Sequence, residues 1–372
     1  MTRSRLAVLA LSAVLLPTAA RADELPPLSI YGFARLDVLA DDARMSDIAA
    51  ATYVMPESAA SRGGELTMTP RLSRVGLGID TWQLADHTTG EGKLEVDFAG
   101  GAGPAAIRLR QAYAAVAFER SVELLAGQTA DLISPLFPSA QNDTQLLYAG
   151  NTGDRRPQIQ LSITPGDRLR AAVGVATTGY LSHADLDNDG RLDGTAAMRP
   201  MLQWLLEYRQ RMRGDVLRLG VWGHVARSKL ADGTTYGGSS VGAHLYLPVT
   251  RKLVALGEAY TGNNLADIGG GIGQGVDPMT RDTIRGAGGW LELAALASDH
   301  HMLALGTSID TARASDLGDG DRERNQTVYG VVRYRPIDAL QLGVEYAHWR
   351  TRYKAAPDGV ANRVDLHASV LF

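Results

Sequence analysis

The chain has 372 residues, no cysteine and a formal net charge of −4 at pH 7. The absence of cysteine excludes a disulfide-stapled scaffold, and the acidic balance argues against nucleic acid as a partner. Beyond residue 22 no apolar segment reaches the roughly 18 residues that a membrane-spanning helix needs, which excludes a helical membrane protein. A β-barrel remains compatible with this mild hydropathy, because each of its strands hides only one face in lipid.

Residues 1–22 have the pattern of an export signal. Basic residues at the N-terminus precede an apolar run over residues 6–16, and residues 20–22 have the small-x-small pattern that signal peptidase reads. The apolar run is too short to span a bilayer as a helix. We therefore expect cleavage after residue 22, so that the mature chain comprises residues 23–372. Because three arginines leave with the signal and no acid does, the mature charge is about −7.

The rest of the chain repeats runs of about ten residues in which polar and apolar side chains alternate. In the last run, Val364, Leu366 and Val370 alternate with Asp365 and His367. A period of two with one apolar face predicts a β-strand, because successive side chains of a strand point to opposite sides. About sixteen such runs are centred near residues 34, 76, 95, 113, 126, 160, 173, 204, 221, 243, 257, 290, 306, 330, 345 and 367.

Short turns and longer loops alternate between these runs. The longer loops fall at about residues 41–70, 99–106, 131–155, 179–197, 228–236, 264–284, 312–325 and 352–361. Such alternation is typical of an even-stranded barrel with both termini on the periplasmic side and its longer loops outside the cell.

A soluble β-sandwich or propeller is the main alternative, since its strands have the same periodicity. The polar faces here carry Arg, Glu and Asp in run after run, which suits a water-filled lumen. The chain also ends on Phe372 after an amphipathic run, which resembles the C-terminal assembly signal of outer-membrane proteins. Aromatic residues near the ends of the runs are candidates for an interfacial girdle: Tyr31, Tyr208, Tyr246, Tyr334, Tyr346 and Trp349. We predict an all-β, transmembrane antiparallel barrel of sixteen strands, surrounded by outer-membrane lipid.

Five segments of the first half occur in an order and spacing found in one family of porins. They are PRLSRVGLG at 70–78, GKLEVDF at 92–98, IRLRQAY at 107–113, LLAGQT at 124–129 and RPQIQ at 156–160. Over residues 29–165 the chain thereby resembles the DcaP-like trimeric porins, while its second half fits only the general barrel pattern. It lacks the N-terminal coiled-coil extension of some members. The resemblance implies a homotrimer of 16-stranded barrels that passes small, often anionic molecules such as dicarboxylates.

Alternation places a set of arginines on the inner wall: Arg35, Arg74, Arg108, Arg110, Arg168, Arg170, Arg218, Arg333 and Arg335. The first four of these come from the first, second and fourth strands, and we expect them to form a basic ladder. Guanidinium groups bind carboxylates bidentately and keep their charge, so the ladder favours small anions. The alternative is that inward acids pair with the arginines and merely keep the lumen hydrated: Asp37, Asp80, Glu95, Asp97, Glu207, Glu292 and Glu345.

The third long loop, residues 131–155, has the ordinal position of the loop that folds into the lumen of general porins. It contains an apolar patch around Phe137 that full exposure to water would disfavour. We expect this loop to form the constriction, with Asp131 and Asp143 facing the basic ladder. The alternative is an outer loop that packs at the centre of a trimer.

Residues 185–196 resemble an EF-hand calcium loop. Asp185, Asp187 and Asp189 occupy positions 1, 3 and 5, a glycine follows at position 6, and Asp193 stands at position 9. Position 12 is Ala196 instead of the usual glutamate, and the flanks are strand-like. Structural calcium with about millimolar affinity is one interpretation, and a solvated acidic loop is the other. No other cofactor is expected.

The glycine-rich stretch 269–275 has a superficial likeness to a phosphate-binding loop. No helix follows it and no Gly-Lys-Ser/Thr motif occurs in the chain, so we expect a flexible outer loop.

The function that fits these patterns is passive diffusion of small polar solutes across the outer membrane. One alternative is an enzymatic barrel of lipase or protease type, and another is an adhesive or structural barrel. His224, His244, His348 and His367 lie on predicted strands, but none stands in a motif that names a partner serine or aspartate. We therefore expect a protein that is not an enzyme.

Overall fold

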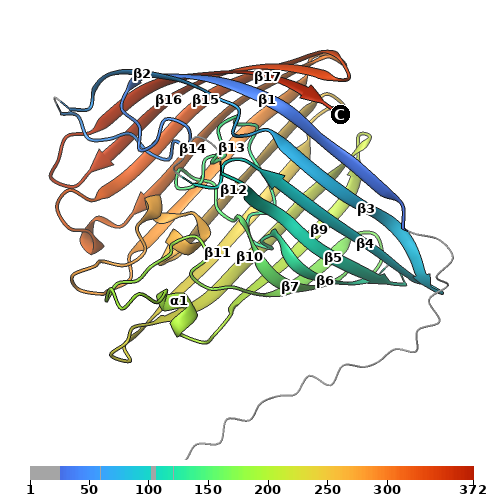
Figure 1. Ribbon diagram of the computed structural model, residues 1–372, viewed down its shortest axis with the longest axis horizontal. Coiled ribbons are helices and arrows are strands. Elements are labelled where there is room, and N and C mark those ends of the chain that lie inside the picture. Colours follow the sequence, from blue (N-terminus) through green and yellow to red (C-terminus); the bar gives the residue numbers. More distant parts are fainter. Residues whose placement is uncertain (1–25, 59, 102–105, 120) are drawn as a thin grey trace, which may run out of the picture.

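The computed structural model describes residues 26–58, 60–101, 106–119 and 121–372. The predicted export signal and its cleavage site lie outside these residues. The described chain forms a closed antiparallel barrel (Figure 1). Its strands are β1 (Leu28–Ala43), β2 (Arg62–Thr69), β3 (Arg74–Ala85), β4 (Thr88–Asp97), β5 (Arg108–Phe118), β6 (Val122–Ala130), β7 (Arg155–Ile163), β8 (Leu169–Ala176), β9 (Met201–Met212), β10 (Asp215–Lys229), β11 (Thr235–Pro248), β12 (Leu253–Asn263), β13 (Arg285–Leu296), β14 (His301–Ala312), β15 (Arg322–Ile337), β16 (Leu340–Tyr353) and β17 (Gly359–Leu371).

Helical structure among the described residues is confined to four short segments in the loops. They are α1 (Asp193–Ala196), η1 (Leu265–Ile268), η2 (Gly271–Gly273) and η3 (Ala314–Asp316). None of the described helices is long and apolar enough to cross a membrane.

The 17 described strand segments fill sixteen positions around the barrel, because β2 and β3 share one position. Strand β1 pairs along one edge with β17 and along its other edge first with β3 and then with β2. A break at Pro70–Ser73 separates the two segments, since proline has no N–H to donate to the ladder. The prediction of a sixteen-stranded barrel is confirmed, and every predicted run coincides with an observed strand.

Strand β2 is a segment of the barrel wall that the sequence pattern assigns to a loop. Residues 62–69 fall inside the predicted first long loop, 41–70, yet they return to the wall and pair with β1. Leu66 and Met68 do alternate and point outward, with 68% and 62% of their surface exposed. The adjacent Gly63 and Gly64, together with Pro70, made this run look like a loop.

The barrel wall buries polar side chains and exposes apolar ones, which is the reverse of a soluble protein. Along β16, Leu342, Val344 and Tyr346 are 39%, 48% and 50% exposed, whereas Glu345 between them is 2% exposed. The same alternation runs through the other long strands. An outer face of this kind suits hydrocarbon, and an inner face rich in Asp, Glu and Arg suits water. The alternative of a soluble sandwich is excluded by this closed barrel.

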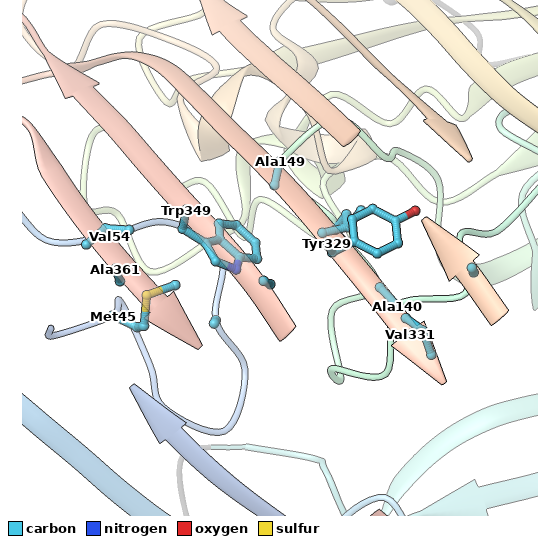
Figure 2. Close-up of a cluster of buried hydrophobic side chains, with 12 residues drawn as sticks. Met45, Val54, Ala140, Ala149, Tyr329, Val331, Trp349 and Ala361 are labelled. Carbon is cyan, nitrogen blue, oxygen red and sulfur yellow. The ribbon is translucent and has the colours of Figure 1, made fainter. Parts of the chain in front are cut away.

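Two loops pack against the inner face of β15, β16 and β17 (Figure 2). Met45 and Val54 come from the first loop, Ala140 and Ala149 come from the third, and they meet the buried inward side of Trp349 and its neighbours. Hydrogen bonds fix the first loop in place, since the Val54 N–H donates to Thr351 Oγ1 at 2.9 Å and Tyr353 Oη donates to the Val54 carbonyl at 2.6 Å. The barrel therefore has a small apolar core made by its own loops.

The predicted aromatic girdle holds for some residues and fails for three, one of which is Tyr246, packed on the inner side against Leu136, Leu256 and Trp290. Tyr334 and Tyr346 are exposed on the outer face, 39% and 50% respectively. Trp349 is 1% exposed in the inner core, and Tyr31 points inward, where its hydroxyl donates to Glu95 at 2.9 Å. Trp349 and Tyr31 share the strand parity of the inward acids Glu345 and Asp37, and this parity outweighs their position near a strand end.

Candidate functional site

The third loop, residues 131–154, is held by carboxylates on the inner wall. The Leu136 N–H donates to Glu258 on β12 at 2.8 Å, and the Ser139 N–H donates to Glu292 on β13 at 2.8 Å. The Gln141 N–H donates to Glu345 on β16 at 2.5 Å. An extended loop leaves backbone donors unpaired, and these acids satisfy them one after another around the wall. Sequence alternation identified Glu292 and Glu345 as inward acids, but not what they bind.

The first residue of the loop, Asp131, is part of a buried polar network. Arg156 Nε donates to its carboxylate at 2.9 and 3.0 Å, and Gln203 Nε2 donates at 2.8 Å. Arg156 also reaches the second buried acid of the network, Asp267, at 3.3 Å. The expectation that Asp131 faces the basic ladder is wrong. The Asp131 N–H donates to the Asp154 carbonyl, and Arg156, two residues beyond Asp154, is the cation that binds the Asp131 carboxylate.

Asp143, in contrast, contacts the predicted ladder. Arg108 Nη2 lies 2.7 Å from Asp143 Oδ1, and Arg71 Nη2 lies 3.5 Å from Oδ2. The other loop residue singled out by the sequence, Phe137, is 44% exposed. Further along the loop, burial and the nearby acids Asp154 and Asp267 raise the pKa of Tyr148 to about 12, so its hydroxyl stays neutral.

The ladder itself is a chain of ion pairs on β3, β4 and β5. Arg108 and Arg110 bind Asp97 at 2.7 and 2.8 Å. Arg110 also binds Glu95 at 2.8 Å, and Arg74 lies 3.5 Å from the same carboxylate. The acids therefore pair with the arginines, as one of the two interpretations of the sequence expects.

Within the ion pairs of this wall cations nevertheless outnumber acids, while Asp80 and Glu91 line the same cavity as Lys93. Lys93 lies 3.6 Å from Glu95, Arg71 lies at Asp143, and Arg155 pairs with Asp154 at 2.8 Å beside Arg108 and Arg110. Among the described residues six cationic side chains thus meet four carboxylates. The six, which we call the basic wall, are Arg71, Arg74, Lys93, Arg108, Arg110 and Arg155. Sequence alternation missed Arg71, which lies in the break after β2, and Arg155, which begins β7.

Arg35 is the one member of the expected ladder that lies apart. Its guanidinium binds Asp37 on its own strand, and its Nη2 donates to the Gln141 carbonyl of the third loop at 2.9 Å. Arg333 similarly donates to the Ser139 carbonyl at 2.5 Å. Both residues therefore hold the loop from the β1 and β15 sides.

The remaining predicted arginines occupy three different places. Arg170 and Arg218 face a cavity of about 320 Å³ that is also lined by Phe137, Glu91 and Glu123. Arg335 is exposed near the short turns and lies 3.3 Å from Gln341. Arg168 lies in the turn before β8, exposed and outside the strands, so its predicted place on the inner wall is wrong. The strand begins one residue later than its alternation suggests.

The acidic loop brings three of its four predicted ligands together. Carboxylate oxygens of Asp185, Asp187 and Asp193 lie within 4.8 Å of one another, while Asp189 instead accepts the Arg191 N–H at 2.8 Å. Burial raises the pKa of Asp193, and the charges of Asp187 and Asp185 add to that effect. A cation at this point would relieve the repulsion among the three carboxylates.

The glycine-rich stretch is not the exposed loop that its composition predicts. Asp310 of β14 accepts the Gly271 N–H at 3.2 Å and the Ile272 N–H at 2.9 Å, and Ile272 is fully buried. Gly269, Gly271 and Gly273 have φ of 82°, 64° and 73°, which side chains rarely adopt. These glycines therefore allow a tight fold against the inner wall.

Two of the strand histidines, His224 and His244, each lie beside a polar side chain, so we compared their contacts with those of a hydrolytic site. His224 Nδ1 lies 2.6 Å from Ser240 Oγ, and His244 Nε2 lies 2.8 Å from Glu207. A hydrolytic site needs a base that is itself oriented by a third group and a nucleophile open to substrate. Among the described residues His224 Nε2 has no hydrogen-bond partner, and Ser240 is 9% exposed. This pair therefore lacks both the orienting third group and the open nucleophile.

The closed sixteen-position barrel with a polar interior and a loop anchored on its inner wall is the fold of the outer-membrane porins. The DcaP channel of Acinetobacter baumannii is similar to this chain, with a TM-score of 0.76 and 18% identity over 93% of this chain and 97% of that one. An anion-selective porin from Comamonas acidovorans gives a TM-score of 0.62 at 12% identity over 93% and 99%. The trimer form of OmpT of Vibrio cholerae gives a TM-score of 0.56 at 12% identity over 93% of this chain and 99% of that one.

No protein-family model matches the sequence, and no curated protein is detectably similar to it. At these low identities the likeness establishes the fold. One of these similar structures, the DcaP channel, is of the kind that the first half of the sequence resembles.

Proposed function

We propose that this protein is an outer-membrane porin that allows passive diffusion of small polar solutes. The observation that carries the proposal is the reversed partition of the wall, with apolar side chains outside and charged side chains inside. A closed sixteen-position barrel of this kind is wide enough for an aqueous channel. Its location in the outer membrane follows from the same outer face, and cleavage of the export signal after residue 22 forms part of the proposal.

The test is conductance of the purified mature protein in a planar lipid bilayer. A porin gives discrete, stepwise increases in current at low voltage, because each inserted barrel opens one aqueous path. An adhesive or enzymatic barrel with a filled lumen gives none. The proposal is contradicted if circular dichroism shows that the protein is folded but no current steps appear in the bilayer.

We further propose that the pore favours small anions such as dicarboxylates. The surplus of cations over acids within the ion pairs of the basic wall supports this, because guanidinium groups bind carboxylates bidentately in a wet channel. Arg74 and Arg108 each leave 28% of the side chain exposed, and Lys93 leaves 30%. These groups are therefore within reach of a passing solute while their acidic partners are almost fully covered.

The double variant Arg74→Gln/Lys93→Gln should shift the reversal potential in a potassium chloride gradient toward cation selectivity. The two side chains are the more loosely held cations of the basic wall, so their loss leaves the acids Glu95 and Asp97 less compensated. The matched control is Arg168→Gln, which removes one cation from an exposed turn and should leave the reversal potential unchanged. An unchanged potential in the double variant would count against an anion preference set by this wall.

A homotrimer is the third part of the proposal. Strands β4 to β8 have 8–11 residues, whereas β9, β10, β11 and β13 to β17 have 12–16. The short side of a barrel covers less of the membrane and is the side where a second copy can pack. The mass of the detergent-solubilised protein by light scattering decides this, and a monomeric mass contradicts it.

We also propose that calcium binds among Asp185, Asp187 and Asp193. Chelation should then lower the melting temperature of the wild-type barrel by about 3 °C, because a ligand that binds only the folded state stabilises it. The effect should shrink as the pH falls, since the raised pKa of Asp193 lets a proton compete with the cation. Asp187→Asn should abolish the chelator effect, and Asp232→Asn, on a neighbouring exposed turn, should retain it. A chelator effect of equal size in both variants contradicts the site.

A further inference from the structure

Four arginines stand on the outer face of the barrel at the loop ends of β14, β15 and β16. Arg313 follows β14, Arg324 lies on β15, and Arg350 and Arg352 lie on β16. Along β16 the two arginines alternate with Thr351, which is fully buried and faces inward. Their side chains are 59% and 58% exposed. We call these four residues the basic rim.

The register brings like charges of the basic rim face to face. Arg324 lies directly opposite Arg352 in the β15–β16 ladder, and Arg350 lies opposite Gln326. Like charges in directly opposed positions on one face of a sheet repel each other, so such a pair favours an anionic partner.

The acids nearby compensate only part of this charge. Arg350 pairs with Asp358 at 2.7 Å, and Arg352 pairs with Glu323 at 3.1 Å. Within the part of the chain that the structure describes, neither Arg313 nor Arg324 forms an ion pair within 4.0 Å. Four guanidinium groups thus meet two carboxylates, and two guanidinium groups remain for an outside partner.

The outer face becomes apolar one step away from the basic rim. Gln326 on β15 and His348 on β16 come next to the rim arginines. Val328 and Tyr346 follow on the membrane side, 53% and 50% exposed, and then Val344 at 48%. Strands β15 and β16 run side by side along this face (Figure 1). The surface therefore changes from apolar to strongly basic within a few residues, at the rim where the long loops lie.

We propose that the basic rim binds the phosphate headgroup of an anionic lipid in the outer leaflet, with an acyl chain lying along Val328, Val344 and Tyr346. The inference rests on the proposed insertion of the barrel with its long loops outside the cell. Arginine binds phosphate through two parallel N–H donors, and an apolar strip beside the headgroup is what a lipid offers in addition to charge. A second copy of the chain fits this face less well, because the short strands β4 to β8 lie halfway around the barrel from β15.

The test measures retention of lipid A, a glycolipid with two phosphates, by the whole mature protein in detergent micelles. The variant Arg324→Gln/Arg352→Gln should retain about tenfold less lipid A than the wild type, since each basic residue near an anionic headgroup adds to its affinity. The matched control Arg251→Gln/Lys252→Gln removes two exposed cations from a short turn at the opposite rim and should bind like the wild type. Both variants change exposed side chains, and unchanged thermal melting verifies their folding.

Two further probes separate a lipid from other anions. Dephosphorylated lipid A should bind wild type and variant equally weakly, and inorganic phosphate in excess should not displace lipid A. Equal retention of lipid A by wild type and the Arg324/Arg352 variant overturns the proposal, as does displacement by phosphate alone. Conductance is recorded in parallel: a silent bilayer with intact lipid retention refutes the pore, and a conducting barrel without retention refutes the lipid site.

Discussion

Deleting residues 135–147 should raise the single-channel conductance by about twofold or more, because the narrowest cross-section limits ion flow through a pore. The segment is anchored on one side by Glu258, Glu292 and Glu345 and on the other by the ion pair between Asp143 and Arg108. Between these anchors it occupies space next to the inner wall that ions would otherwise use. The measurement is the step size in a planar bilayer, in the same salt for deletion and wild type.

Two comparisons make the deletion interpretable. Removing residues 278–281, an exposed turn of an outer loop, shortens the chain without touching the anchors and should leave the step size unchanged. The triple variant Glu258→Gln/Glu292→Gln/Glu345→Gln keeps the loop but replaces its charged acceptors with weaker neutral ones, so the open channel should become noisier. If the deletion conducts like the wild type, the third loop is not the constriction.

The strands were predictable because their signal is local. Whether residue 345 faces inward depends on alternation with residues 344 and 346, and no distant contact changes that parity. The same parity explains why the prediction for Trp349 was wrong. Trp349 has the parity of the inward Glu345, but its aromatic ring near the end of a strand suggested the membrane interface. Strand β2 was missed because two glycines and a proline hide a run that pairs with only one neighbour.

The site was only half predictable, because its partners meet across the lumen. The pairs of Arg108 and Arg110 with Asp97 join neighbouring strands and could be expected from register. The bond from Leu136 to Glu258 joins residues 122 positions apart, and nothing in the local sequence indicates it. The first loop is a similar case: its apolar residues Met45 and Val54 are a weak sign of burial, but the wall they contact belongs to the far end of the chain.

Replacing Arg156 with methionine should cost about 3–5 kcal/mol of unfolding free energy, the usual penalty for leaving a buried acid without its cation. Arg156 is fully buried, and its removal leaves Asp131 and Asp267 without their shared guanidinium. Its Nη2 also donates to the Asp267 carbonyl at 2.7 Å, so the same side chain fixes the start of the third loop and the η1 segment. Urea unfolding of the barrel in detergent micelles measures the loss.

The adjacent residue provides the matched control. Arg155→Met breaks an ion pair whose members are 18% and 22% exposed, and a pair in contact with water should cost less than about 1 kcal/mol. The double variant Arg156→Met/Asp131→Asn should be less destabilised than the sum of its single changes, because each single change leaves a charge buried that the double change removes. Should Arg156→Met prove no more harmful than Arg155→Met, the network around Asp131 would have to be hydrated, and the third loop would owe its position to the acids of β12, β13 and β16 alone.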